Sequence, residues 1–191
     1  RHQFEFIKGF IPQSIFIGLK GTFAPWVGAL VKDIHQPILL VVPDEMQKET
    51  IIRLSRVGFD NVLGYLQGGF ESWEASGKEV DTLQSVSAEV LAQQLDKDAL
   101  VFDVRKPGEY AAEHIENVTS TPLDFLNDHL TEFPTNKDFY VHCAGGYRSV
   151  IAASILKARG FRKVIDVAGG YGAIKETGIK RTQATACSNS K

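Results

Sequence analysis

Short apolar runs alternate with amphipathic segments along most of the chain. Residues 37–42 and 100–105 are apolar runs of the kind found in strands buried on both faces, and the second turns polar at its end. Segments 45–57 and 88–95 follow these patterns with helical spacing, and Ser87 is placed as the N-cap of the later helix. Strands that alternate with helices indicate parallel pairing and right-handed crossovers. The pattern predicts an α/β fold with binding sites beyond the carboxyl ends of its strands.

The chain also repeats itself at a nearly constant spacing. Matching residues are 104 positions apart near the start, then 102 and finally 101, which indicates two copies of one α/β unit with small loop differences. The second copy has an additional front, residues 85–104, so we expect the first copy to lack its opening helix and strand. The chain does not begin with methionine, and we expect it to be part of a longer polypeptide. The matches are Arg1, Glu5, Phe6, Ile11 and Leu19 with Arg105, Glu109, Tyr110, Ile115 and Leu123; Gly58-Phe59 with Gly160-Phe161; and Gly68-Gly69 and Gly77 with Gly169-Gly170 and Gly178.

This repeat sets the expected organisation of the chain. In the first copy we expect Ile51, Ile52 and Leu54 to face inward from their helix, with Gly58 as its C-terminal stop. A strand at 62–66 should follow. The predicted segments are a first unit at 1–80, a linker at 81–84, a second unit at 85–181 and a polar tail at 182–191.

The candidate chemistry concentrates in residues 139–153. An aromatic and β-branched strand leads to Cys143, and an Ala-rich helix is expected to begin at about Arg148 or Ser149. The N-terminus of that helix would favour an anion, and a cysteine held there should ionise more readily than a free one. The glycines at 145 and 146 let successive amides curl around one point, and the arginine adds a permanent positive charge. The segment predicts a thiolate in an anion-binding cradle.

Composition limits the partners and the compartment. The formal net charge is −2, so the overall charge does not attract nucleic acid or an acidic membrane surface. No apolar run reaches membrane-spanning length. The two cysteines, Cys143 and Cys187, argue against a disulfide framework and favour a reducing, cytoplasmic location. The five histidines lack ligand spacing, so we expect no metal site and no other cofactor.

Three residues keep alternative interpretations at this point. Cys143 could be a small buried hydrophobe, although a structural cysteine needs neither two following glycines nor a closing arginine. Asp103 could cap a loop, or it could brace Arg105 or the cradle. His114 could be a hydrogen-bonding support or an acid or base, and the first interpretation is favoured.

The ordered motifs resemble a rhodanese domain. The resemblance covers about residues 85–180, and the first copy resembles the same domain over 1–80. It implies a parallel five-stranded sheet flanked by helices in each unit, with the active-site loop between a strand and the next helix. The motifs are Asp103-Val104-Arg105, Glu109-Tyr110, His114-Ile115, Pro122-Leu123, Cys143-Ala144-Gly145-Gly146-Tyr147-Arg148-Ser149, Gly160-Phe161 and Gly169-Gly170.

The resemblance also implies a sulfurtransferase reaction without a cofactor. The Cys143 thiolate would attack the outer sulfur of thiosulfate or a persulfide, and a thiol-type acceptor would remove that sulfur from the resulting Cys143 persulfide. The partners would be a small anionic sulfur donor and a thiol acceptor. The expected binding residues are Ala144, Gly145, Gly146, Tyr147, Arg148 and Arg105, with Lys106 near them, and the expected supporting residues are Asp103, His114 and Ser149.

The first copy lacks the residues of the predicted site, and alternative functions remain open. Val41–Met46 replace the cysteine, the glycines and the arginine, so the first copy should be catalytically silent. Rhodanese-like phosphatases have one more residue between cysteine and arginine, and four intervening residues favour sulfur. A different class remains open, a non-enzymatic persulfide carrier or docking module. The ordered pair resembles the C-terminal half of bacterial fusions whose first domain has a metallo-β-lactamase fold of the persulfide dioxygenase or glyoxalase II-like kind, which we expect upstream.

Overall fold

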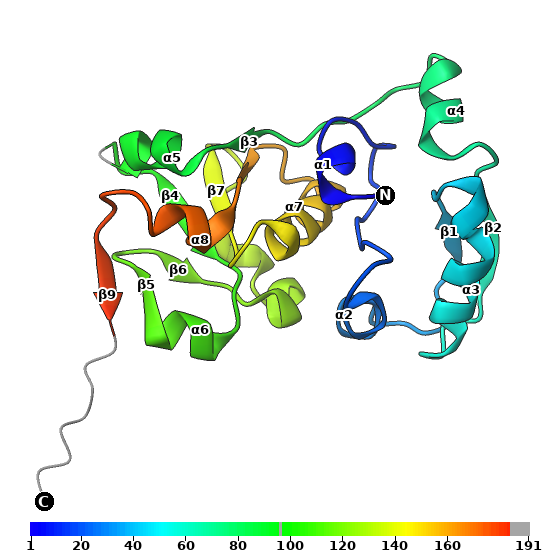
Figure 1. Cartoon of the computed structure of the whole chain (residues 1–191), viewed down its shortest axis with the longest axis horizontal. Coiled ribbons are helices and arrows are strands. Elements are labelled where there is room, and N and C mark those ends of the chain that lie inside the picture. The colour runs from blue at the N-terminus through cyan, green and yellow to red at the C-terminus, as the bar shows by residue number, and fades with distance from the viewer. Residues whose placement is uncertain (96, 184–191) are drawn as a thin grey trace, which may run out of the picture. The chain divides into compact units, whose positions relative to one another are not determined.

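The computed structural model describes residues 1–95 and 97–183, which fold as two compact units. Unit 1 comprises Arg1–Leu83 together with Ser154–Gly160, and unit 2 comprises Gln84–Ala153 and the chain from Phe161 onward. Both have α/β character (Figure 1). The boundary near residue 83 lies close to the predicted linker, whereas the assignment of residues 154–160 to unit 1 has no counterpart in the sequence prediction.

Unit 2 is built on a five-stranded sheet whose pairs are all parallel. The sheet agrees with the predicted fold, and β4 is two residues shorter than the apolar run at 100–105 that predicted it. In spatial order the strands are β3 (Ser85–Val86), β8 (Val164–Val167), β7 (Phe139–His142), β4 (Leu100–Asp103) and β6 (Thr119–Ser120).

The helices of unit 2 follow these strands in turn (Figure 1). A separate antiparallel pair joins β5 (Glu113–Ile115) to β9 (Arg181–Gln183), so Thr182 belongs to a strand rather than to the predicted polar tail. Within the described residues, no helix combines the length and apolar character required to cross a bilayer. The helices are α5 (Ala88–Leu95), α6 (Pro107–Ala112), α7 (Tyr147–Ala158) and α8 (Gly170–Ile174), with 3₁₀ turns at Leu123–Asp128 and Leu130–Glu132. The last turn of α7, from Ser154, is assigned to unit 1.

Strand alternation divides the buried side chains of unit 2 between two faces of its sheet. On one face, Val101, Tyr140 and Ile165 pack in a cluster with α5 and α8. Phe102 and Phe139 alternate with these residues and join an aromatic cluster with Phe133 and Phe161, with ring centroids 4.4–6.5 Å apart. The core therefore positions the carboxyl ends of β4, β7 and β8 together at one edge, where Cys143 follows β7.

Unit 1 contains a smaller sheet than the resemblance implied. Its described residues form only two parallel strands, β1 and β2, instead of about five. Leu54 of α3 is buried as predicted, but Ile51 and Ile52 are 38% and 41% exposed, because the described part of this unit offers the outer side of the helix too little to pack against. The elements are α1 (Gln3–Phe6), α2 (Phe23–Leu30), β1 (Ile38–Leu40), a 3₁₀ turn (Asp44–Met46), α3 (Gln47–Ser55), β2 (Val62–Tyr65) and α4 (Gly69–Ala75).

The register of β1 with β2 matches that of β7 with β8. Leu39 and Leu40 pair with Gly64 and Tyr65, and the residues 101 positions later in the chain, Tyr140 and Val141 with Ile165 and Asp166, form the same pairs. The preceding pairs, Ile38 with Val62 and Phe139 with Val164, differ by one residue because β2 contains an irregularity that skips Leu63. This bulge accounts for the shift of the repeat spacing from 102 to 101.

The predicted linker is partly structured within unit 1. Asp81 and Phe10 form an antiparallel bridge with backbone hydrogen bonds of 2.8 and 2.9 Å. The Leu83 N–H donates to the Ile7 carbonyl oxygen at 3.0 Å, and the Leu83 side chain is buried. Residues 81–83 therefore belong to the fold of unit 1 rather than to a free connection.

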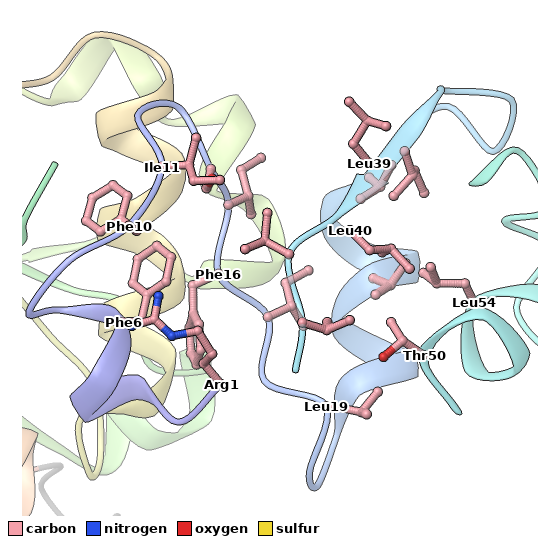
Figure 2. A pocket seen from close by; sticks show the side chains of 18 of the residues that line it. Arg1, Phe6, Phe10, Ile11, Phe16, Leu19, Leu39, Leu40, Thr50 and Leu54 are labelled. Carbon is pink, nitrogen blue, oxygen red and sulfur yellow. The ribbon is translucent and has the colours of Figure 1, made fainter. Parts of the chain in front are cut away.

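A cavity of about 350 Å³ lies beside β1 in unit 1. Figure 2 shows Phe6, Phe10 and Phe16 on one side of it and Leu40 and Leu54 on the other. Among the described residues β1 pairs with β2 alone, whereas β7 at the equivalent place in unit 2 has β4 as a second neighbour. The cavity is thus the expected consequence of a sheet that lacks the equivalent of β4.

Candidate active site around Cys143

Cys143 lies directly after β7, and its sulfur faces the beginning of α7. The Gly146 N–H donates to Cys143 Sγ with a distance of 3.1 Å, and Gly146 adopts a φ of +94° that brings this amide inward. The sequence predicted a ring of main-chain donors around the sulfur, and the Gly146 N–H is one such donor. The sulfur accordingly lies at the N-terminal end of a 12-residue helix, as its position in the chain predicted.

The Cys143 side chain lies beneath the loop rather than at the surface. Cys143 is 1% exposed, while Ala144 and Gly145 are exposed. Tyr147 begins α7 and is half-buried, together with Arg148. The sulfur faces a hydrogen-bond donor, the Gly146 N–H, which agrees with a reactive thiol. Its burial argues against unhindered access of a sulfur-donating molecule.

The start of α8 anchors the Cys143 loop. The Tyr171 N–H donates to the Cys143 carbonyl oxygen at 2.6 Å, and the Gly172 N–H donates to the Ala144 carbonyl oxygen at 2.9 Å. Gly170 has a φ of +53°, and a Cβ atom at this position would collide with the Cys143 carbonyl oxygen. The second glycine of the Gly169-Gly170 pair is therefore required by the close approach of α8 to the loop.

Unit 1 keeps the same close approach without the cysteine. A Cβ atom on Gly69 would lie 3.1 Å from the Val42 carbonyl oxygen, and both residues stand 101 positions before Gly170 and Cys143. The loop of unit 1 holds an acidic side chain, because Asp44 accepts a hydrogen bond from the Gly68 N–H at 2.9 Å. The backbone arrangement is thus shared between the units, while the side chains are not.

Replacing Gly170 with alanine should displace the Cys143 loop. The change combines an unfavourable positive φ with a steric clash against backbone, and we expect it to lower the free energy of unfolding by about 2–4 kcal/mol. Chemical denaturation measures this loss. Gly172→Ala is the matched control in the same helix: its Cβ would make an ordinary 3.5 Å contact, so stability should change by less than about 1 kcal/mol. Equal losses in the two variants would contradict the anchoring role of α8.

Arg148 forms a two-pronged ion pair with Glu109. Arg148 Nη1 and Nη2 donate to Glu109 Oε2 and Oε1 at 2.6 and 2.8 Å. Glu109 also accepts the Lys106 N–H at 3.0 Å and so caps α6. The hydrogen bonds from Arg148 lower the pKa of Glu109 to about 2. Because this pKa lies below the ordinary value of 4.5, the pair stabilises the fold above that pH, and the contribution disappears as the pH falls toward 2.

Glu109→Gln tests whether this pair positions Arg148. The glutamine still offers an oxygen to cap α6, but it removes the charge that fixes both guanidinium nitrogens. We expect the rate at which the Cys143 sulfur reacts with an anionic sulfur donor to fall by about tenfold or more, because small displacements of a positioned charge are costly. Reactions that are stopped at successive times and analysed by mass spectrometry measure that rate. Glu116→Gln is the exposed control and should react normally; an unchanged rate in Glu109→Gln would exclude the positioning role.

Asp103 and Arg105 form a buried pair beside this loop. The two side chains are 0% and 4% exposed, and the Arg105 guanidinium donates to both carboxylate oxygens at 2.7–3.0 Å. It also donates to the Glu113 carbonyl oxygen at 2.7 Å and stacks 3.8 Å above the Tyr171 ring. Asp103 also accepts the Arg105 backbone N–H at 2.9 Å, so the geometry shows both interpretations of Asp103, the loop cap and the brace of Arg105.

This geometry differs from the predicted role of Arg105. The sequence placed its guanidinium at the anionic end of a sulfur donor, but burial and the Asp103 carboxylate occupy the group. The reason is the short spacing between the two residues, which lets the side chains pair at the end of β4. Lys106 is exposed, and its contribution to the site is the backbone N–H that Glu109 accepts.

Two histidines lie in different surroundings. His142 is fully buried with Nδ1 3.4 Å from the Cys143 carbonyl oxygen, and burial lowers its pKa, so the ring is neutral at physiological pH. His114 lies in β5, where Nδ1 is 2.8 Å from the Tyr110 carbonyl oxygen and the two rings stack at 3.9 Å. The contacts of His114 hold α6 against β5, which is a supporting arrangement.

Ser149 lies below the sulfur, on α7. The Cys143 thiol donates to Ser149 Oγ with a sulfur to oxygen distance of 3.6 Å. Beyond Ser149, Asp166 of β8 is buried, and Ser85 donates to its Oδ2 at 2.8 Å. Sequence reasoning selected Ser149 but did not select Asp166, since an acidic residue inside an apolar run carries no sign of the residues that it meets.

Glu109 was also missed as a site residue. It matched Glu5 in the repeat, and the signal that could have identified it is its place three residues after Lys106 and one turn into a helix that begins with Pro107. In unit 1 the equivalent Glu5 contacts Lys8 at 3.3 Å instead. Across the residues that the structure describes, no three His, Cys, Asp or Glu side chains converge as a metal site requires. Cys187 lies outside the described residues.

Comparisons with known proteins place unit 2 in a family. Residues 87–177 match the family model described as a Rhodanese-like domain. The chain is 34% identical over 99 residues to the provisionally named sulfur carrier protein YrkF of Bacillus subtilis, covering 51% of this chain and 54% of that protein. It is 29% identical over 90 residues to a sulfurtransferase of Allochromatium vinosum, covering 46% of this chain and 84% of that protein.

Part of the chain is also similar to a solved structure. The chain is similar to the rhodanese-like domain protein of Staphylococcus aureus, with 31% identity, a TM-score of 0.48, and coverage of 51% of this chain and 97% of that one. The chain spans about half the length of the first curated relative. The match of the family model includes β4, the Cys143 loop and α8. Residues 87–177 form a rhodanese-like domain.

Proposed function

We propose that unit 2 transfers sulfane sulfur through a persulfide on Cys143. The single observation that supports it best is the 3.1 Å hydrogen bond from the Gly146 N–H to Cys143 Sγ at the N-terminus of α7. An amide and a helix terminus directed at one sulfur atom stabilise negative charge that a transfer reaction brings there. The sulfurtransferase of Allochromatium vinosum and the sulfur carrier protein YrkF, each similar to about half of the chain, support the same chemistry.

The proposed reaction has two steps. The Cys143 thiolate attacks the outer sulfur of thiosulfate or a persulfide; a sulfur–sulfur bond forms at Cys143 while the donor bond breaks, and sulfite or a thiolate leaves with the bonding electron pair. A thiol acceptor, as its thiolate, then attacks the terminal sulfur of the Cys143 persulfide. The acceptor persulfide leaves and the Cys143 thiolate is restored.

The residues of the loop have distinct roles in this proposal. Gly146 supplies the N–H that stabilises negative charge, and the exposed Ala144 and Gly145 form the rim that the donor meets. Arg148 provides positive charge near the sulfur while Glu109 holds it in place. Four residues separate Cys143 from Arg148, one fewer than in rhodanese-like phosphatases, which favours sulfur over phosphate as the group bound.

We also propose that unit 1 is a second, silent rhodanese-like unit. The shared register of its strands and the shared approach of Gly69 to the Val42 carbonyl support common ancestry of the two units. Val42 stands where unit 2 has Cys143, and Asp44 brings a carboxylate to the loop. A supporting or docking role follows for unit 1. The metallo-β-lactamase-fold domain upstream stays a prediction, which the mass of the intact gene product tests.

Turnover distinguishes a transferase from a sulfur carrier. With thiosulfate or glutathione persulfide as donor and excess thiol as acceptor, a transferase forms acceptor persulfide in many equivalents per protein. A carrier loads one equivalent and stops until a partner protein removes it. Release of sulfite or thiol, followed over time, measures the stoichiometry. Absence of both loading and turnover would overturn the proposed function.

A further inference from the structure

The cavity in unit 1 lies between two segments that have equivalents in unit 2. Residues 13–17 line one side of it, and residues 36–42, which include β1, line the other (Figure 2). In the repeat, residues 15–16 correspond to β6, 104 positions later, and β1 corresponds to β7, 101 positions later. The strand between β7 and β6 in unit 2 is β4. The cavity therefore occupies the place of a central strand.

Arg1 lies at one end of this place. Its guanidinium donates to the carbonyl oxygen eight residues later in the chain at 3.0 Å, and it lies 4.1 Å from the centroid of the Phe70 ring. Arg105 follows β4 and makes the same two contacts, with the carbonyl oxygen eight residues later at 2.7 Å and with the Tyr171 ring at 3.8 Å. Phe70 stands 101 positions before Tyr171. Arg1 is thus held as a residue that follows a central strand.

One face of β1 is also uncovered. Leu39 is 74% exposed, whereas Tyr140, which stands 101 positions later, is 8% exposed. Tyr140 packs in one cluster with Ala88 and Leu91 of α5, the helix that directly precedes β4 in the chain. A helix followed by a strand would therefore cover Leu39 and fill the cavity at the same time.

We propose that the groove formed by residues 13–17 and 36–42 binds a helix and a parallel β-strand from the segment directly before Arg1 in the longer polypeptide that the sequence predicts. This rests on the proposal that unit 1 is a second rhodanese-like unit. The strand joins the edge of β1 that faces residues 15–17, and the helix covers Leu39. Main-chain hydrogen bonds to a strand edge supply affinity, and the side-chain pockets beside the edge supply specificity.

The chemistry of the groove specifies its occupant. The lining is mostly apolar, so the strand needs a nearly continuous apolar pattern, as β4 has in Leu100–Phe102. In unit 2, Asp103 accepts a 2.7 Å hydrogen bond from the Arg105 guanidinium, and the equivalent position lies two residues before Arg1. A carboxylate at that position would meet the Arg1 guanidinium. This charge complementarity favours a segment continuous with Arg1 over the strand of a separate protein.

An extended chain tests the groove directly. A copy of residues 84–104 joined before Arg1 gives unit 1 the segment that precedes Arg105 in unit 2. Hydrogen exchange of the backbone amides at 38–42, followed by mass spectrometry, should slow by about tenfold or more relative to the 191-residue chain. The matched control carries Phe102→Pro in the appended copy, which removes an N–H from the strand and should restore the faster exchange.

Equal exchange with and without the appended segment, or slowing that survives Phe102→Pro, would overturn the proposal. Leu39→Lys gives a second readout. Because Leu39 is 74% exposed, this change should leave the unfolding midpoint of the 191-residue chain where it is. In the extended chain it should speed the exchange at 38–42, since the appended helix then meets a charge, and an unaffected exchange rate there would contradict coverage of Leu39.

The intact gene product identifies the natural occupant. Its amides at 38–42 should exchange as slowly as those of the extended chain. Exchange as fast as in the 191-residue chain would overturn the proposal, and so would protection of that chain that grows with its own concentration, because a second copy would then fill the groove. None of these measurements uses sulfur transfer. Sulfur uptake at Cys143 with unprotected amides at 38–42 would refute this proposal alone, and the reverse result would refute the proposed function alone.

Discussion

Replacing Cys143 with serine is expected to abolish sulfur uptake by the chain. The serine hydroxyl is a weak nucleophile that stays protonated at neutral pH. Among the described contacts of the residue 143 side chain, no general base is present that could remove its proton. The loss should therefore be complete within detection, while the loop keeps its backbone hydrogen bonds from α8. Incubation with thiosulfate, followed by a cold-cyanolysis assay for sulfane sulfur, measures it.

Cys187→Ser is the matched control, because it removes the other thiol of the chain. It should take up sulfur at the rate of the unaltered chain. Uptake retained by Cys143→Ser and lost in Cys187→Ser would show that the two cysteines have the opposite roles. A thermal melt of both variants should coincide with that of the unaltered chain, since each replacement changes one atom.

Arg105→Ala should have the largest effect on stability. Removing the guanidinium leaves the Asp103 carboxylate fully buried with the Arg105 backbone N–H, at 2.9 Å, as its remaining close donor. An uncompensated buried charge of this kind costs about 3–5 kcal/mol. It also leaves the Glu113 carbonyl oxygen and the Tyr171 ring without their cationic neighbour. Against a typical total of about 5–15 kcal/mol, the change should lower the midpoint of urea unfolding sharply.

Two further variants test the origin of this loss. Arg181→Ala breaks the more exposed 3.0 Å pair with Glu113 in the same unit and should cost about 1 kcal/mol or less. Arg105→Lys keeps the charge but cannot match both carboxylate oxygens, so its stability should fall between the alanine variant and the unaltered chain. A loss below about 1 kcal/mol in Arg105→Ala would contradict the buried pair.

The sequence was a good guide to the elements of unit 2. Its apolar runs gave β4 and β7 because strands buried on both faces have a nearly continuous apolar pattern. Helix α5 has the predicted bounds, and Ser87 caps it with a 3.4 Å hydrogen bond to the Val90 N–H. The reactive loop and the start of α7, one residue earlier than expected, were also accessible, since glycines and the following helix are local signals.

Partners far apart in the chain were not accessible in the same way. Glu109 and Arg148 lie 39 residues apart, and nothing in either local pattern indicates that they meet. Asp103 and Arg105 were recognised together, but their burial was not, because a charged pair at a strand end is usually solvated. In unit 1, helical spacing predicted that Ile51 and Ile52 face inward, yet the described part of this unit has too small a sheet to cover them.

The most direct measurement of the central claim is the mass of the peptide that contains Cys143 after the chain is exposed to thiosulfate or glutathione persulfide. We expect the gain of one sulfur atom on residue 143, which a thiol removes and which is absent in Cys143→Ser. Cys143 is 1% exposed in the structure. If a sulfur donor cannot reach it in the folded protein, the peptide will keep its original mass. That result would contradict the transfer of sulfur through Cys143.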